Sequence, residues 1–291
     1  MSNKSFENAT QLAKSNIVRT IYGDILSTHK STNDQFTPLK YTTLNELHDV
    51  YPEEVPRKGE MPKIGYIAIG NKGAKAIPTT DGIATIQEYD HSPEDAGLYG
   101  PIPFVVRQAN NDLSPQERLR YRMRVPFVKG GISYVAYYLM AIDTDSSPVR
   151  AEIRHVENGA IQSRPFEPED SSYLTPVPRE KSNLNVNDPK GDCLVAVKQV
   201  SVSLDATDIA EIINACTVMF DNPAYAIISE LAICSGVDRV VSGSFGNTTG
   251  SYTESIATQI CVFTRQFKKL TENDNHLKIT VDLGSSEPLL F

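Results

Sequence analysis

The sequence contains no tryptophan, no closely spaced cysteine pair and no long apolar run. Its four cysteines, Cys193, Cys216, Cys234 and Cys261, are far apart, and none forms a C-x-x-C motif. We therefore expect buried free thiols rather than disulfides or metal-binding thiolates. A membrane-spanning helix needs about 18 or more consecutive apolar residues, and residues 1–5 lack the apolar core of a signal peptide. We therefore expect no membrane contact.

Basic charge is also scarce in this chain. It carries 28 Lys and Arg against 36 Asp and Glu, which gives a formal net charge of -8 at pH 7. Binding to nucleic acid depends on basic side chains that neutralise phosphates, so this balance disfavours nucleic acid as a specific ligand. The chain does contain 13 tyrosines, and tyrosine is enriched where proteins contact one another. The composition therefore favours protein partners.

Sequence motifs for catalysis, metal binding and cofactor binding are missing. No two histidines have the spacing of an H-E-x-x-H zinc site, and residues 242–246 lack the spacing of the G-x-S-x-G nucleophile elbow. Residues 70–73, Gly-Asn-Lys-Gly, do not complete a Walker phosphate loop. We predict a protein without catalytic residues, cofactor or metal. The alternative is an enzyme whose site is assembled from scattered residues, such as a distant Cys and His.

Short apolar runs between turn residues predict a β-rich α+β protein with an antiparallel, β-sandwich-like core. Gly130-Gly131 and Asn158-Gly159 each separate two such runs, as in β-hairpins. Residues 193–204 and 276–283 alternate apolar and polar side chains, as half-buried strands do. Residues 242–251 are rich in Gly, Ser and Thr and predict a loop.

The sequence also predicts helices. Residues 5–26 carry apolar side chains at helical spacing, and this amphipathic helix must pack on its own domain or on a neighbour. Thr43 and Glu46 have the spacing of a capping box, which predicts a short helix. Either Asp205 or Thr207 caps a further helix that begins near residue 206.

Proline-rich segments divide the chain into four parts. Residues 1–63 are predicted to form the N-terminal helix and an extended arm, and residues 64–162 a β-rich domain. Residues 163–191 hold five prolines and predict a linker or a segment that crosses a surface. Residues 192–291 are predicted to continue the core as an α+β region. Long irregular arms are rare inside one compact domain. They are common in subunits that wrap around each other, so an arm of this length favours contact with a neighbouring subunit.

An arginine run is the most unusual pattern. In residues 118–125 four arginines, Arg118, Arg120, Arg122 and Arg124, alternate with apolar residues. Ser114 to Glu117 form a capping box with proline at the first helical position, so a short helix precedes a strand that begins near Arg122. This junction splits the arginines between two elements. It favours separate carboxylate partners, in the same chain or in an adjacent subunit, over a continuous phosphate-binding stripe.

A tyrosine-containing strand follows. Residues 132–142 are apolar at nearly every position and include Tyr134, Tyr137 and Tyr138. A strand of this kind is buried on both faces or covered by a neighbour. We predict that these tyrosines and the four arginines contribute to a subunit interface.

Several segments resemble uncharacterised virion structural proteins of contractile-tailed bacteriophages. The resemblance covers roughly residues 64–291 and is carried by residues 103–107 (Pro-Phe-Val-Val-Arg), 110–114 (Asn-Asn-Asp-Leu-Ser), 134–143, 228–236 and 283–290. It implies a ring-forming component and brings no catalytic residues to this chain.

We therefore expect a structural protein of a tailed-phage virion that forms a ring at the neck or collar between head and tail. Its expected partners are identical subunits and other virion proteins, because rings of identical subunits form through head-to-tail contacts. Its expected location is the virion, after assembly in the host cytoplasm. The second hypothesis is a baseplate or tail-associated module that binds another virion protein or a receptor.

Overall fold

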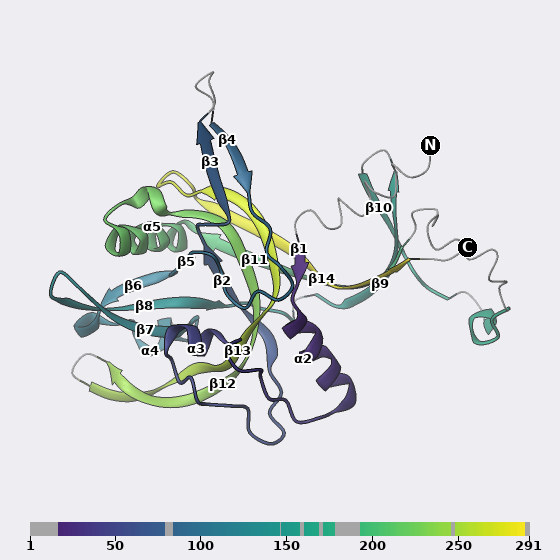
Figure 1. The fold of residues 1–291 in the computed structure, drawn as a ribbon, viewed down its shortest axis with the longest axis horizontal. Coiled ribbons are helices and arrows are strands. Elements are labelled where there is room, and N and C mark those ends of the chain that lie inside the picture. Colours follow the sequence, from purple (N-terminus) through teal and green to yellow (C-terminus); the bar gives the residue numbers. More distant parts are fainter. Residues whose placement is uncertain are drawn as a thin grey trace. The chain divides into compact units, whose positions relative to one another are not determined.

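The computed structural model describes residues 17–78, 84–145, 147–157, 160–168, 171–177, 193–245 and 248–288 (Figure 1). The protein is rich in strand, with 50% of residues in strands and 19% in helices, and its sheets are antiparallel. This confirms the predicted β-rich α+β fold class.

The largest sheet contains eight strands and carries the core. Its order is β1-β13-β12-β2-β8-β6, with β5 paired to β2 and β7 paired to β8. These strands are β1 (Ile17–Arg19), β2 (Lys63–Gly70), β5 (Pro101–Ile102), β6 (Val105–Gln108), β7 (Tyr121–Lys129), β8 (Ile132–Ala141), β12 (Ile227–Phe245) and β13 (Thr248–Lys269).

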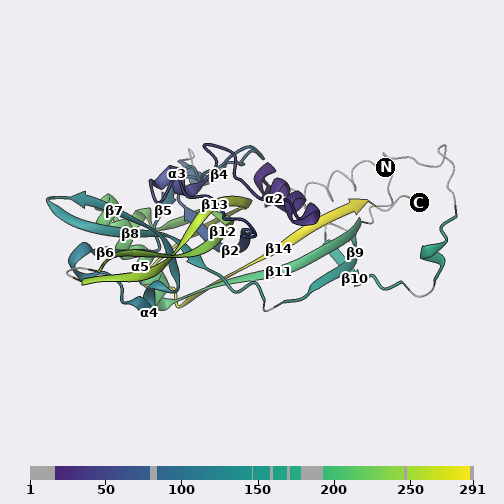
Figure 2. The ribbon, with the colours of Figure 1, turned by 90° about the horizontal axis from the view of Figure 1, so that it is seen from below.

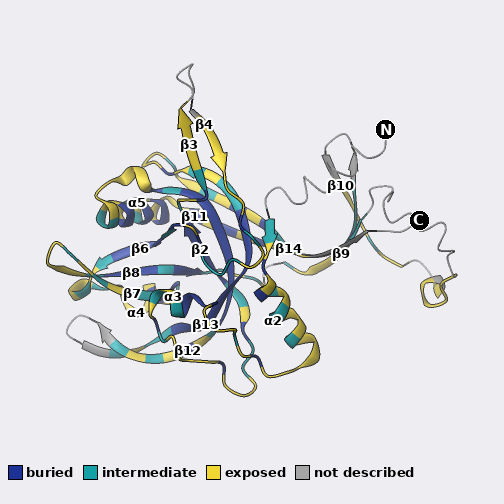
Figure 3. Ribbon diagram, viewed as in Figure 1, coloured by how far each residue is buried: buried dark blue, intermediate teal, exposed yellow. Residues whose placement is uncertain are grey.

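The centre of this sheet is buried because its strands are apolar on both faces. Ile67 of β2 pairs with Ile233 of β12, and both side chains are completely buried. Figure 3 shows the buried middle of β2, β12 and β13 against exposed strand ends. Residues 242–251 were expected to form a loop, and this prediction was wrong for residues 242–245 and 248–251; residues 246 and 247 lie outside the described residues. Ser242 pairs with Ser251, and the pairing continues to Phe245 and Thr248, because cross-strand bonds order a segment whose composition alone suggests a loop.

Three of the helices have the caps that the sequence predicts. The helices are α2 (Ile21–Thr32), α3 (Leu44–His48), α4 (Pro115–Arg118) and α5 (Ala206–Phe220). Thr43 and Glu46 form the capping box of α3, Ser114 and Glu117 that of α4, and Asp205 caps α5. In each case side-chain hydrogen bonds satisfy the backbone N–H of the N-cap residue and that of the third helical residue.

The N-terminal helix is shifted from its predicted position. A helix was expected over residues 5–26, but residues 17–19 form β1, which pairs with β13 through residues such as Val18 and Phe263. Helix α2 then begins after Thr20, whose side chain accepts a hydrogen bond from Gly23 N, and ends at Thr32 with Asn33 as its C-cap. The β-branched Ile17 and Val18 suit the edge of the sheet, which explains the difference. Residues 5–16 lie outside the described residues.

The segment predicted as an extended arm, 27–63, packs against its own sheet. Asn45 is 1% exposed, its Oδ1 accepts a hydrogen bond from Thr258 N, and its Nδ2 donates to Ser255 O. These bonds give partners to backbone groups of β13 at Ser255 and Thr258, where β1 does not pair with it. They hold α3 against β13. The described residues of this segment are therefore not a free arm.

Two smaller sheets complete the described structure. Four strands in the order β10-β9-β11-β14 form one of them: β9 (Val149–Glu157), β10 (Ala160–Pro165), β11 (Cys193–Asp205) and β14 (His276–Pro288). Figure 2 shows β11 and β14 side by side. Strands β9 and β10 form the predicted hairpin, with Glu157 opposite Ala160; its turn residues, 158 and 159, lie outside the described residues. Strands β3 (Ala74–Pro78) and β4 (Ala84–Glu88) pair with each other in a two-stranded sheet.

The chain divides into two compact units. The larger comprises residues 17–143 and 202–278, and the smaller includes the described residues of 144–201 and 279–288. This division does not follow the four consecutive segments expected from the sequence, because strands distant in the chain pair with one another. Strands β11 and β14 have residues in both units.

Candidate functional site

The helix-to-strand junction at the arginine run has the predicted form. Helix α4 ends at Arg118, and β7 begins at Tyr121. Arg118 and Arg124 both lie near Asp112, whose side chain is 1% exposed. Arg124 Nε donates to Asp112 Oδ2 over 2.9 Å, and Arg118 Nη1 is 3.9 Å from the same oxygen. The Arg118 guanidinium also lies 3.8 Å from the ring centroid of Tyr252, a distance that suits a cation–π contact.

The other two arginines have partners of their own. Arg122 is 6% exposed and donates to Asp238 from Nε and Nη2 over 2.9 and 3.3 Å. Its Nη1 also donates to the carbonyl oxygens of residues 118, 119 and 121. Arg120 pairs with Asp208 of the α5 cap at 2.7 Å. The run therefore meets several separate carboxylates of its own chain, and its role at a subunit interface stays a prediction.

A buried glutamate links the two outer parts of the large sheet. Glu254 on β13 is 1% exposed and accepts hydrogen bonds from Met123 N at 2.6 Å and Arg124 N at 3.1 Å on β7. Met123 has a left-handed backbone, with φ of 56°, which interrupts the alternation of the run. Burial raises the pKa of the Glu254 carboxyl, and the backbone N–H groups act in the opposite direction.

The three predicted tyrosines do not form one surface. Tyr137 is 1% exposed and donates from its hydroxyl to Asp112 Oδ1 over 2.7 Å. Tyr134 stacks on Phe127, with ring centroids 5.4 Å apart. Tyr138 stacks on His48 at 4.4 Å. Strand β8 is therefore covered by its own chain at Tyr137, while Tyr134 and Tyr138 are half-buried.

A second cluster surrounds His91 in the larger unit. His91 Nδ1 lies 2.9 Å from Asp95 Oδ2, and its Nε2 lies 2.8 Å from Glu230 Oε2. The His91 ring stacks on Phe263 at 3.7 Å and on Tyr99 at 4.1 Å. The result is a buried carboxylate–imidazole–carboxylate arrangement next to β12 and β13.

Glu230 also binds the backbone of two loops. Its carboxylate accepts hydrogen bonds from Tyr99 N at 3.0 Å, from Gly100 N at 2.9 Å and from Lys72 N at 3.4 Å. A side chain at Gly70 would collide with this carboxylate, because a Cβ there would overlap Glu230 Oε1. Glu230 thus holds both the turn before β3 and the loop after β4.

Strands β3 and β4 form a two-stranded ribbon, which we call the β3–β4 ribbon. Figure 1 shows it projecting away from the large sheet, and its described residues 75–78 and 85–88 are all exposed. Ala76 lies opposite Ile86, so these side chains share one face with Pro78. At the base of the ribbon Tyr89 N donates to Gly73 O over 2.8 Å, and Asp90 pairs with Arg265 of β13 at 2.8 Å.

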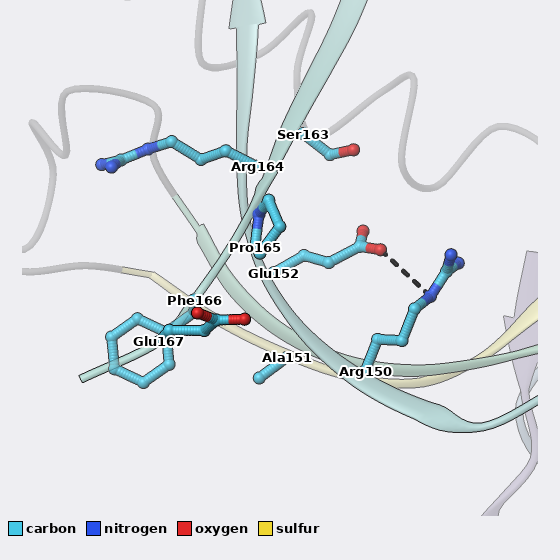
Figure 4. A pocket seen from close by; sticks show the side chains of 8 residues that line it. All are labelled: Arg150, Ala151, Glu152, Ser163, Arg164, Pro165, Phe166 and Glu167. Atoms are coloured by element: carbon cyan, nitrogen blue, oxygen red, sulfur yellow. Dashed lines mark ion pairs between the residues drawn. The ribbon is translucent and has the colours of Figure 1, made fainter. Parts of the chain in front are cut away.

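The smaller unit contains an open pocket of about 360 Å³ beside β9 and β10. It is lined by residues including Arg150, Glu152, Arg164, Phe166 and Glu167. Figure 4 shows Glu152 paired with Arg150, and the Arg164 guanidinium directed away from that pair. Because acidic and basic side chains alternate around the pocket, its lining does not favour a ligand of one charge.

Sequence reasoning missed the His91 cluster. His91 and Glu230 are 139 residues apart, and no short motif links them. One signal was available, because Glu230 is a lone carboxylate within the apolar residues 226–234. A charged residue that is fully buried requires hydrogen-bonding partners, so its position could have indicated a polar cluster.

A family model matches residues 6–291, and its description is a family of unknown function, DUF7208. The chain belongs to this family. No curated protein and no solved structure matches it. Within the described ranges, no group of three or more His, Cys, Asp or Glu has an arrangement that could hold a metal ion. No helix in that part of the chain is long and apolar enough to cross a membrane.

Proposed function

We propose that this chain is a structural component of a tailed-phage virion, where identical subunits form a ring at the neck or collar. The observation that carries the proposal is the β3–β4 ribbon. Its strands pair only with each other among the described strands, and its side chains at Ala76, Pro78 and Ile86 are exposed.

A two-stranded hairpin is only marginally stable alone in water. The ribbon therefore gains most from packing its apolar face on another surface, and an identical subunit supplies that surface at every position of a ring. The resemblance of residues 64–291 to virion proteins of contractile-tailed phages supports the same assignment.

The mass of the assembly tests this proposal. Native mass spectrometry and negative-stain microscopy of the purified chain are expected to reveal closed rings. The variant Ile86→Asp places a charge on the apolar face of the ribbon and is expected to yield monomers with an unchanged circular dichroism spectrum. Val240→Asp is the matched control, because Val240 is 70% exposed on β12, and it should leave the rings intact. A wild-type chain that stays monomeric at high concentration contradicts the proposal.

The second candidate, a baseplate or receptor-binding module, is favoured by Tyr41. This residue is 77% exposed and has a left-handed backbone with φ of 64°. Glu46 accepts a hydrogen bond from Tyr41 N over 2.9 Å and so holds the Tyr41 backbone in a conformation that bulky residues rarely adopt. If this module is the function, Tyr41→Ala abolishes binding of the purified chain to host cells and leaves its oligomeric state unchanged.

A further inference from the structure

One edge of β12 is open at the far end of the β12–β13 hairpin. Strand β12 pairs with β13 as far as Phe245, but β2 covers its other edge only over residues 230–236. Residues 237–245 therefore have no strand partner on that edge among the described strands. Val240 is 70% exposed there, and Ser242 is exposed as well (Figure 3). We call residues 237–245 the open edge of β12.

The backbone groups that point out of the open edge follow from the bonds of Ser255. Ser255 N donates to Glu254 Oε1 over 2.9 Å, and Ser255 O accepts from Asn45 Nδ2 over 2.8 Å. Both groups are used away from Asp238, the residue opposite on β12, so this is a non-hydrogen-bonded pair. The register continues from this pair to the end of β12 without an irregularity, and such pairs recur at every second residue. The residues that direct both N–H and C=O away from β13 are therefore 240, 242 and 244.

The open edge lacks the residues that usually protect an edge strand. Charged side chains and proline discourage pairing with another chain. At the other edges of the two larger sheets, each strand of three or more residues carries a charged side chain; examples on β1, β6, β7, β10 and β14 are Arg19, Arg107, Arg124, Arg164 and Lys278. Residues 240–253, in contrast, contain no charged residue, no histidine and no proline. The sequence therefore leaves this edge able to accept a further strand.

A second copy of the same edge fits these backbone groups. When two copies lie antiparallel about a two-fold axis at Ser242, Ser242 faces its own equivalent and Val240 faces Ser244. Each of these residues then bonds through both backbone groups, which gives about six N–H···O bonds between the copies. Like charges directly opposite each other destabilise a strand pair, and residues 240–245 bring none. Asp238 lies beyond the paired residues, so its charge has no equivalent opposite it.

We propose that two copies of this chain join through the open edge of β12, so that their large sheets become one continuous sheet. The partner is a second copy because the edge meets in itself the two requirements of strand pairing, matching backbone groups and no opposed like charges. The contact is isologous, so it joins two copies and closes no ring. It uses no residue of the β3–β4 ribbon and goes beyond the proposed function.

The pairing is weak when it acts alone. A short strand pair without a packed face is only marginally stable in water, so single chains dimerise at high protein concentration and stay monomeric at low concentration. Several such contacts act together when copies are already held side by side. In a ring, which rests on the proposed function, the open edges of one ring would therefore join those of a second ring.

Sedimentation equilibrium of the full-length Ile86→Asp chain tests the pairing without the ribbon. We expect monomers at low concentration and a monomer–dimer equilibrium at high concentration. Adding Ser242→Pro removes one outward N–H from each copy, and proline is tolerated where an edge N–H faces solvent. Dimerisation should weaken about tenfold or more, because two hydrogen bonds are lost. Adding Ser251→Pro is the matched control. Ser251 lies opposite Ser242 and directs its N–H out of the other edge of the hairpin, so the dimer should persist.

A charge exchange at Ser242 tests the two-fold axis and keeps every backbone group. Ser242→Lys or Ser242→Glu, each added to the Ile86→Asp chain, places like charges opposite each other and should prevent dimerisation. A mixture of the two variants should form a heterodimer, because Lys then faces Glu. Circular dichroism of each variant is expected to match that of the parent chain.

Three results overturn the pairing. They are a dimer that persists in both charged variants, a mixture of these variants that stays monomeric, and a dimer that is lost in Ser251→Pro but kept in Ser242→Pro. If the wild type forms rings while Ile86→Asp is monomeric at every concentration, the pairing is overturned and the proposed function stands; the open edge is then left to a strand of another protein. A wild type that stops at dimers supports the pairing and contradicts the ring.

Discussion

Glu254 on β13 accepts a hydrogen bond from the backbone N–H of Met123 on β7 over 2.6 Å. Strands β7 and β13 are not paired through their backbones, so this carboxylate takes the place of a neighbouring strand at that point. It also lets Met123 keep its left-handed backbone, because the N–H groups on both sides of the irregularity have an acceptor.

Replacement of Glu254 by glutamine should destabilise the protein. The amide would direct N–H donors at backbone N–H donors and leave a buried group without a partner, which costs about 1 to 3 kcal/mol. Urea denaturation of Glu254→Gln measures this free energy of unfolding. The control is Glu272→Gln in the exposed turn after β13, which should be neutral. An unfolding free energy equal to that of the wild type would contradict this role of the Glu254 carboxylate.

Acid should weaken the packing of α3 through His48. Burial lowers the pKa of His48 from 6.5 to about 4. The unfolded chain therefore binds a proton that the folded chain does not, and stability falls as pH drops from about 6.5 to about 4, by up to about 3 kcal/mol. His48→Phe keeps the stack on Tyr138 and cannot titrate, so it should lose this component. His276→Phe should retain it. The measurement is the free energy of unfolding in urea across this pH range.

Two of the carboxylates that pair with the arginine run, Asp112 and Asp238, should differ in importance. Asp112→Asn removes the buried charge shared by Arg118 and Arg124 and should cost about 3 kcal/mol or more. Asp238 is 51% exposed, and Arg122 keeps its carbonyl partners without it, so Asp238→Asn should cost less than about 1 kcal/mol. The free energies of unfolding of the two variants in urea decide this order. A larger loss in Asp238→Asn would show that the Arg122–Asp238 pair stabilises the protein more than the contacts of Asp112.

Two glycines next to β3 and in β2 provide a matched pair. A Cβ at Gly73 would lie 2.8 Å from Ser229 O and 2.9 Å from Glu230 Cβ, whereas at Gly65 the nearest atom is 3.9 Å away. Gly73→Ala should therefore destabilise the protein by more than about 1 kcal/mol, within the usual range for an overpacked site. Gly65→Ala should change stability little. Thermal unfolding of both variants measures the difference, and equal melting temperatures would contradict the close contact at Gly73.

The parts of the fold that depend on neighbouring residues could be predicted from the sequence. The capping boxes at Thr43 and Ser114 and the hairpin at Gly130-Gly131 are local, because the bonding groups lie within a few residues. Gly130 and Gly131 indeed have φ of 58° and 79°, which suits glycine. The prediction of a helix-to-strand junction at the arginine run was confirmed for the same reason.

The long-range arrangement could not be predicted in this way. Asp208 and Asp238 reach the arginine run from 88 and 116 residues away, and either could have been a solvated charge on sequence grounds. The His91 cluster depends on the same kind of distant contact. Periodicity gives the face of a strand and leaves its neighbours open, so the pairing of β2 with β12 had no signal in the sequence.

The position of β2 between β12 and β8 has a consequence for synthesis. Gly70 pairs with Glu230, which the ribosome adds about 160 residues later, roughly 10 to 30 s at ordinary elongation rates. During that interval the apolar edge of β2 has no permanent partner on the side that β12 will occupy. The nascent chain is therefore exposed to aggregation until β12 (Ile227–Phe245) emerges, and a chaperone that binds apolar strands would act in that interval.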